Sequence, residues 1–194
     1  MAKLYFKYGA MNSGKSTVLL QTAHNYEERG MNVILIKPSV DSKAEDKISS
    51  RLGVERRVDN LVKPEDSIID IVKNYDNLSC IFVDEAQFLT PKQVDELLII
   101  TVDYDIPVIC YGLRADFKNN GFPGSIRLFE IAQKLEEIKT MCRCGSKATM
   151  NARFVNDNLV FDGDQVVIDN QESIRYESMC PKCYYKNLRL IRKW

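Results

Sequence analysis

Residues 9–16 read Gly-Ala-Met-Asn-Ser-Gly-Lys-Ser, and they lie between an apolar segment at 4–8 and a helical pattern at 15–29. Glycines in such a loop let the backbone curl so that successive N–H groups face one point, where the following helix also presents its positive end. This spacing between a strand and a helix is typical of a phosphate-binding loop, or P-loop. The chain is therefore expected to bind a nucleotide and to fold around this strand–loop–helix unit.

Every position of the loop is a candidate nucleotide contact. Lys15 is expected to supply a cation for the β- and γ-phosphates, which makes it a candidate catalytic residue, and the hydroxyl of Ser16 is a candidate ligand of Mg²⁺. The predicted nucleotide-binding residues of the loop are Gly9, Ala10, Met11, Asn12, Ser13, Gly14, Lys15 and Ser16.

Strand and helix patterns alternate over the first two-thirds of the chain. Apolar runs predict further strands at 33–36, 80–83 and 107–111, and a fifth at 137–141. Helices are expected to begin at Pro64 and Pro91, and a third, capped by Ser125, is expected to reach about Leu135. The polar residues 38–58 are interpreted as irregular. The alternation predicts an α/β fold of the P-loop NTPase kind, a parallel sheet with helices on both faces.

Two carboxylates directly follow the apolar strand at 80–83. Ligands of open α/β sheets bind at the carboxyl ends of the strands, so Asp84 is expected to hold Mg²⁺ together with Ser16. Glu85 is then free to act as a base on water or on a substrate hydroxyl. The predicted nucleotide-binding residues of this segment are Asp84, Glu85, Ala86 and Gln87.

The charge balance disfavours nucleic acid and membranes as partners. The chain has 194 residues, and its 27 lysines and arginines equal its 27 aspartates and glutamates, so no net field attracts a polyanion. No apolar run approaches the roughly 18 residues of a membrane helix, and the first residues lack the apolar region of a signal peptide. The cytoplasm is the predicted compartment.

Six cysteines divide into two groups. Cys80 and Cys110 lie in apolar runs and are interpreted as core residues. In a reducing compartment the paired thiols near the C-terminus indicate a metal rather than disulfides, and a four-thiolate shell without an open position predicts a structural Zn²⁺. The predicted zinc ligands are Cys142, Cys144, Cys180 and Cys183.

The character of the sequence changes near Met141, where short β-favouring pieces such as 165–168 replace the helical patterns. We therefore expect a nucleotide-binding domain at 1–141 and a small zinc-stapled subdomain at 142–194.

Across almost its whole length the sequence resembles the zinc-containing, cytosolic type of thymidine kinase. The motifs that carry the resemblance, in order, are 9–16, Ser49-Ser-Arg-Leu-Gly53, Asp84-Glu-Ala-Gln-Phe88, Tyr111-Gly-Leu-Arg-Ala-Asp-Phe117 with Phe122, the two cysteine pairs, and Val166-Val-Ile168 leading to Tyr176. Each motif alone is a weak signal, and their order and distances make the set specific.

The resemblance implies a kinase that uses Mg·ATP and thymidine. It implies that Glu85 is the general base for the 5′-hydroxyl and that Arg51 is an active-site arginine. It also implies that a lasso loop, about 154–176, reads the base through backbone groups. The family usually has Gly-Gly after the Val-Ile pair, whereas here Asp169-Asn170 follows Ile168 and the segment is longer. The nucleoside-binding residues that it implies are Met11, Phe88, Leu113, Phe117, Phe122, Ile168, Asp169, Asn170 and Tyr176. Feedback by dTTP and a homotetramer belong to the same expectation.

Two other functions stay open at this level. The P-loop and the acidic segment also fit an ATPase whose Glu85 activates water, whereas the absence of an Asn-Lys-x-Asp sequence disfavours a GTPase. The basic residues after Cys180 leave room for a zinc-ribbon nucleic-acid-binding protein with a nucleotide switch, although zero net charge counts against it.

Overall fold

The computed structural model describes residues 1–39, 46–165 and 174–192. Its helices are α1 (Lys15–Glu27), α2 (Ile68–Val72), the 3₁₀ turn η1 (Ala86–Phe88), α3 (Pro91–Asp103), α4 (Pro123–Ile131) and α5 (Pro181–Arg192). The strands of the first lobe are β1 (Leu4–Gly9), β2 (Asn32–Pro38), β3 (Lys47–Ser49), β4 (Glu55–Arg57), β5 (Asn60–Val62), β6 (Leu78–Val83), β7 (Val108–Leu113) and β8 (Lys134–Glu137). Those of the second lobe are β9 (Thr140–Met141), β10 (Lys147–Ala148), β11 (Met150–Val155), β12 (Asn158–Val160) and β13 (Ile174–Met179).

A six-stranded sheet in the order β5-β2-β6-β7-β1-β8 forms the centre of the first lobe. Each of its strand pairs is parallel. Strands that are covered on both faces must be apolar throughout, and all six residues of β7 are buried. The predicted parallel α/β sheet is thus confirmed.

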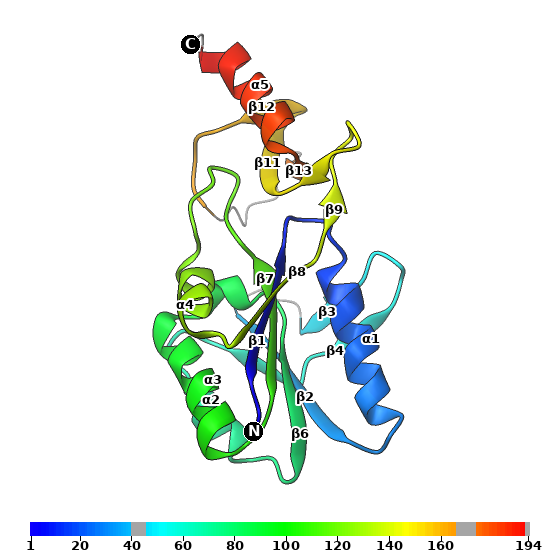
Figure 1. The fold of residues 1–194 in the computed structure, drawn as a ribbon, viewed down its shortest axis with the longest axis vertical. Coiled ribbons are helices and arrows are strands. Elements are labelled where there is room, and N and C mark those ends of the chain that lie inside the picture. Colours follow the sequence, from blue (N-terminus) through cyan, green and yellow to red (C-terminus); the bar gives the residue numbers. More distant parts are fainter. Residues whose placement is uncertain (40–45, 166–173, 193–194) are drawn as a thin grey trace.

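Helices cover both faces of this sheet (Figure 1). On one face α1 packs its buried Leu19 and Ala23 against Leu35, Phe82 and Tyr111 of the sheet. On the other face α2, α3 and α4 contribute apolar side chains to a larger cluster with β1, β2, β6 and β7. The crossover helices therefore hold the sheet between two apolar layers, as the sequence pattern predicted.

Two predicted helix starts are wrong. The helix expected from Pro64 begins at Ile68, because the side chain of Ser67 accepts a hydrogen bond from Asp70 N at 3.3 Å and caps the helix there. Ser125 is not a cap but lies inside α4, which ends at Ile131. Its buried hydroxyl donates instead to Leu113 O at 2.5 Å.

Short strands account for the other differences. The segment 38–58, interpreted as irregular, contains the antiparallel pair β3–β4. The strand predicted at 137–141 is replaced by β8 at 134–137, the last strand of the large sheet in chain order. Leu4 N donates to the side chain of Gln133, and β8 then pairs in parallel with β1. The β-favouring piece at 165–168 lies mostly outside the described residues.

The second lobe sits over the carboxyl ends of the parallel strands (Figure 1). The β9–β10 hairpin leads into an antiparallel sheet in the order β12-β11-β13, and α5 packs on β11 through Tyr184, Ala152 and Phe161. No helix in the described ranges combines the length and the apolar character that crossing a membrane requires.

We expect Gly124→Ala to lower the free energy of unfolding by about 1–3 kcal/mol, as overpacking does. A Cβ at Gly124 would lie 2.5 Å from Ala86 O and 2.7 Å from Leu89 O, and backbone atoms cannot move aside cheaply. Urea unfolding of the variant measures the loss, with Glu130→Ala on the exposed side of α4 as the control. Equal stability of wild type and Gly124→Ala would show that η1 and α4 are packed less closely.

Candidate active site

The P-loop connects β1 to α1 over the carboxyl edge of the sheet. Asn12 and Gly14 both have positive φ, 64° and 82°, so the loop curls back on itself before the helix begins at Lys15. Gly9 cannot be replaced by a larger residue without rearrangement, because a Cβ there would lie 2.6 Å from both Ile138 O and Ser13 Oγ. The local sequence therefore determines the curl that leaves loop N–H groups available for an anion.

Lys15 is a buried cation at the start of α1. Its Nζ donates to Ala10 O at 2.9 Å, across the opening of the loop. Burial lowers the pKa of Lys15, while the nearby carboxylates of Glu85 and Asp84 act in the opposite direction. A phosphate in the loop would further favour the charged form of this buried lysine.

Ser16 and Asp84 face each other at the end of β6. The Ser16 hydroxyl donates to Asp84 Oδ2 at 3.3 Å, so both oxygens reach one point beside the P-loop. Burial raises the pKa of Asp84 to about 7, and the adjacent Glu85 carboxylate adds to the rise. A hydroxyl and a carboxylate in this arrangement suit Mg²⁺, which prefers oxygen ligands and would favour the ionised carboxylate.

A first cavity of about 510 Å³ opens on the P-loop. Residues 11–18 form one wall, and the turn of the β3–β4 hairpin, with Arg51, forms another. Glu85 and Leu113 close it on the side of the sheet. The structure thus brings Arg51 into the same cavity as Lys15 and Glu85, although the three residues lie far apart in the sequence.

A second cavity of about 250 Å³ adjoins the first. Six residues that the sequence predicted for nucleoside binding line it, namely Met11, Phe88, Leu113, Phe117, Phe122 and Tyr176. The rings of Phe88 and Phe122 meet edge to face, with centroids 5.5 Å apart. Aromatic walls of this kind suit a flat ring compound with apolar substituents. The other three predicted residues, Ile168, Asp169 and Asn170, lie outside the described residues.

Three polar residues of the second cavity were missed by the sequence reasoning: Asp116, Asn151 and Gln165. Asn151 accepts a hydrogen bond from Met11 N and donates to Ala115 O, both at 2.7 Å, so one buried amide joins the P-loop, the loop after β7 and the second lobe. Gln165 donates to Asp116 Oδ2 at 3.1 Å. The motif at 111–117 contains Asp116 and was the available signal for it, whereas no local pattern marks Asn151.

The acidic segment lies between the two cavities. Glu85 lines both and has φ 50° and ψ 37°, a left-handed conformation that is uncommon for a residue with a side chain. Ala86 is fully buried, and Gln87 lines the second cavity and contacts Glu85. A phosphate in the first cavity and a ring compound in the second would therefore meet at Glu85.

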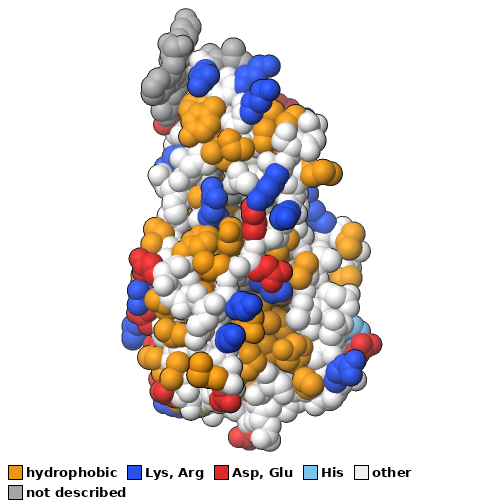
Figure 2. All heavy atoms as spheres, viewed as in Figure 1, with side chains coloured by type: hydrophobic (Ala, Val, Ile, Leu, Met, Phe, Trp, Pro, Cys, Tyr) orange, Lys and Arg blue, Asp and Glu red, His pale blue; other side chains and the backbone are white. Residues whose placement is uncertain are grey.

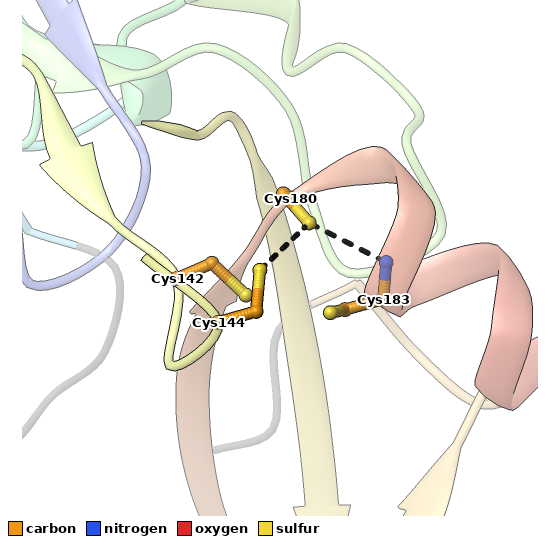
Figure 3. A group of neighbouring side chains, drawn as sticks. All are labelled: Cys142, Cys144, Cys180 and Cys183. Atoms are coloured by element: carbon orange, nitrogen blue, oxygen red, sulfur yellow. Dashed lines mark hydrogen bonds between the residues drawn. The ribbon is translucent and has the colours of Figure 1, made fainter. Parts of the chain in front are cut away.

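The four predicted zinc ligands lie together in the second lobe. Their sulfur atoms are all within 4.8 Å of one another, and a tetrahedral zinc–thiolate shell requires sulfurs about 3.8 Å apart. Figure 3 shows the side chains converging from the turn after β9 and from the start of α5. Cys183 N donates to Cys180 Sγ at 3.4 Å, a contact that favours a thiolate. These residues fit a structural Zn²⁺ with four sulfur ligands.

The strand–loop–helix unit, the buried Lys15 and the two adjoining cavities fit the class of P-loop proteins that bind a nucleotide beside a small molecule. A family model described as thymidine kinase matches residues 2–184. Curated proteins named thymidine kinase match as well. The protein of Rhodopirellula baltica is 46% identical over 93% of this chain and 86% of its own length, and that of Shewanella oneidensis is 46% identical over 94% and 96%. That of Ruegeria pomeroyi is 44% identical over 94% and 93%. The chain belongs to the thymidine kinase family.

The Asp84 carboxyl predicts a pH effect on the metal-free protein. An acid whose pKa rises from 3.8 to about 7 on folding binds more protons in the folded state, so stability falls as the pH rises between these values. Asp84→Asn removes this loss, and we expect it to stabilise the metal-free protein at pH 8 by roughly 2 kcal/mol. Denaturant unfolding at pH 5 and pH 8 measures it, with the exposed Asp103→Asn as the control. An Asp84→Asn variant that is equally destabilised at both pH values contradicts it.

The cysteine cluster predicts about one Zn²⁺ per chain. We expect Cys180→Ser to lose the metal and to unfold at a lower temperature, because the cluster joins the β9–β10 turn to the start of α5 in the second lobe. Elemental analysis and thermal unfolding measure both effects. Cys80→Ala, in the core of the sheet, should keep the metal. Zinc-free wild-type protein of full stability would refute the assignment.

Proposed function

We propose that this chain transfers the γ-phosphoryl group of ATP to the 5′-hydroxyl of thymidine and so produces dTMP. The observation that carries the proposal is that Met11, Glu85 and Leu113 line both cavities, so a donor phosphate and an acceptor nucleoside would adjoin at one carboxylate. Membership of the thymidine kinase family supports the same donor and acceptor.

On the donor side, the loop residues Gly9 to Ser16 would hold the phosphates. The N–H groups of the loop and the positive end of α1 attract the anion, and the buried Lys15 would contact the β- and γ-phosphates. Ser16 and Asp84 would hold Mg²⁺, which when bound neutralises the charge that develops on the phosphates. Arg51 lines the same cavity and would steady phosphate charge or orient Glu85.

On the acceptor side, the aromatic cavity would hold the thymine ring. Phe88, Phe117 and Phe122 supply flat apolar walls, and Leu113 supplies an apolar niche for the 5-methyl group. The deoxyribose would then extend toward Glu85. As the new O–P bond forms and the bond to ADP breaks, the hydroxyl proton passes to the Glu85 carboxylate.

The two lobes would have different roles in substrate binding. We propose that 1–141 binds ATP and that 142–194 closes over the nucleoside as a lasso, with Zn²⁺ on Cys142, Cys144, Cys180 and Cys183 tying its base together. Contacts between the two lobes at Phe117, which lines the second cavity, support the proposed closure over the nucleoside. Tyr184 donates to Phe117 O at 2.6 Å, and the guanidinium of Arg153 lies 3.7 Å from the centroid of the Phe117 ring.

The chemistry of the cavities also supports regulation by dTTP. A thymine ring and a triphosphate on one molecule match the two adjoining cavities, so dTTP would compete with both substrates. We further propose a cytoplasmic homotetramer, for which the support is family membership and exposed apolar residues on α3 such as Val102. Acidic and basic side chains are interspersed on the face of the first lobe in Figure 2, which disfavours nucleic acid as a partner.

The proposal is tested by incubating the protein with Mg·ATP and a panel of nucleosides and identifying the monophosphate that forms. Thymidine-dependent production of dTMP with little ATP hydrolysis in its absence is expected. Rapid hydrolysis without any nucleoside would favour an ATPase whose Glu85 activates water.

Glu85→Gln isolates the proposed general base. The amide keeps the shape of the side chain but cannot accept the proton, and loss of a general base typically lowers the rate about 10²–10⁴-fold. Binding of ATP and thymidine should persist, because the P-loop and the aromatic cavity are intact. Turnover measured beside equilibrium binding checks both statements. Normal turnover would remove Glu85 as the base, and equal loss of ATP binding would assign it to the metal or phosphate site.

A further inference from the structure

The side chain of Gln87 is almost completely enclosed, with 1% of it exposed, and both ends of its amide are engaged. Its Oε1 accepts a hydrogen bond from Leu113 N at 3.0 Å, and its Nε2 donates to Glu85 Oε2. Because a backbone N–H can only donate, the bond to Leu113 determines which end of the amide faces Glu85.

The surroundings hold this amide in place. Gly112 lets β7 approach closely, since a Cβ there would lie 2.9 Å from Gln87 Oε1. Leu113 is itself held in place. Its carbonyl accepts a hydrogen bond from the Ser125 hydroxyl at 2.5 Å, and its N–H donates to Gln87, so both backbone groups of Leu113 are engaged. The end of β7 thus holds the Gln87 amide and α4 holds the end of β7, so the amide presents its N–H donor to Glu85 from a fixed position.

Glu85 lines both cavities, so a fixed orientation of its carboxylate matters for what it can contact. It sits in a left-handed backbone conformation at the boundary of two open cavities, and it is only partly buried. A carboxylate has two oxygens, and Gln87 engages one of them. The other oxygen remains available to a group that enters from either cavity.

We infer that Gln87 is a positioning residue for the phosphoryl transfer: it holds one oxygen of Glu85 so that the other faces the substrate hydroxyl. This inference rests on the proposed function, in which Glu85 is the base. It departs from the sequence prediction that Gln87 contacts the nucleotide, since its amide is occupied by Glu85 and Leu113.

Gln87→Met tests the inference, because methionine keeps the length of the side chain and removes both hydrogen bonds. We expect kcat to fall by about 10²-fold, as a misplacement of about 1 Å can cause. The KM values for ATP and thymidine should stay close to wild type. A raised KM for thymidine with unchanged kcat would overturn the inference, since Gln87 would then only shape the nucleoside cavity.

The double variant Glu85→Gln with Gln87→Met distinguishes a positioning role from a purely structural one, through the additivity of the two effects on kcat. If Gln87 acts through Glu85, the second substitution should lower kcat little further once the base is gone. Multiplying effects would show that Gln87 acts independently of Glu85 and would overturn the inference. Thymidine-dependent turnover by the wild type tests the proposed function alone, so failure of that function is distinguished from failure of this inference.

A matched control is available in α3. Gln93 is also buried, with 2% exposed, and its amide donates to Lys63 O and Asp66 O at 2.7 and 3.1 Å. Gln93→Met should reduce stability and leave kcat unchanged. If Gln87→Met does not fold, Gln87→Asn keeps a polar amide but is too short to span Leu113 and Glu85, and it should show the same loss of kcat. Wild-type kcat in Gln87→Asn would overturn the inference.

Discussion

The parallel register between β1 and β7 is the constraint on which the site depends. Gly9 at the end of β1 pairs with Leu113 at the end of β7, and β6 joins β7 on its other side. Because parallel strands end at the same edge of a sheet, this register brings the P-loop, the acidic segment and the wall of the aromatic cavity to one place. A shift by one residue would turn the buried residues of β7 to the opposite faces and separate these groups.

The second lobe depends on a small number of contacts at that same edge. Asn151 hydrogen-bonds to the P-loop and to the loop after β7, and Tyr184 and Arg153 both contact Phe117. Buried polar contacts of this kind are directional, so they specify one orientation of the lobe where apolar packing alone would allow several. The cysteine cluster lies in the same lobe and would hold its turns while these contacts form.

Local chemistry explains which features were predictable. The P-loop, the acidic strand end and the cysteine pairs are contiguous motifs whose spacing follows directly from their chemistry, so the sequence identified them. The apolar runs identified the large strands for the same reason. Three contacts were not predictable in this way. Ser125 and Gln133 act through partners outside their own segments, Leu113 and Leu4. Ser67 caps a helix whose start was predicted at the nearby Pro64. Asn151 was missed because its two partners lie 140 and 36 residues away.

By itself, the sequence determined the parallel α/β class, the phosphate-binding loop, the two carboxylates and the four cysteines, since these depend on hydrophobic periodicity and on short motifs. The family resemblance implied Arg51 and the six apolar and aromatic residues as site residues, and the tertiary structure places Arg51 in one cavity with Lys15 and the six in a second cavity beside it. The tertiary structure alone decided that the amide of Gln87 donates to Glu85. These are relations between segments that meet only when the sheet register and the docking of the second lobe are complete, and no local pattern encodes a distance across such a junction.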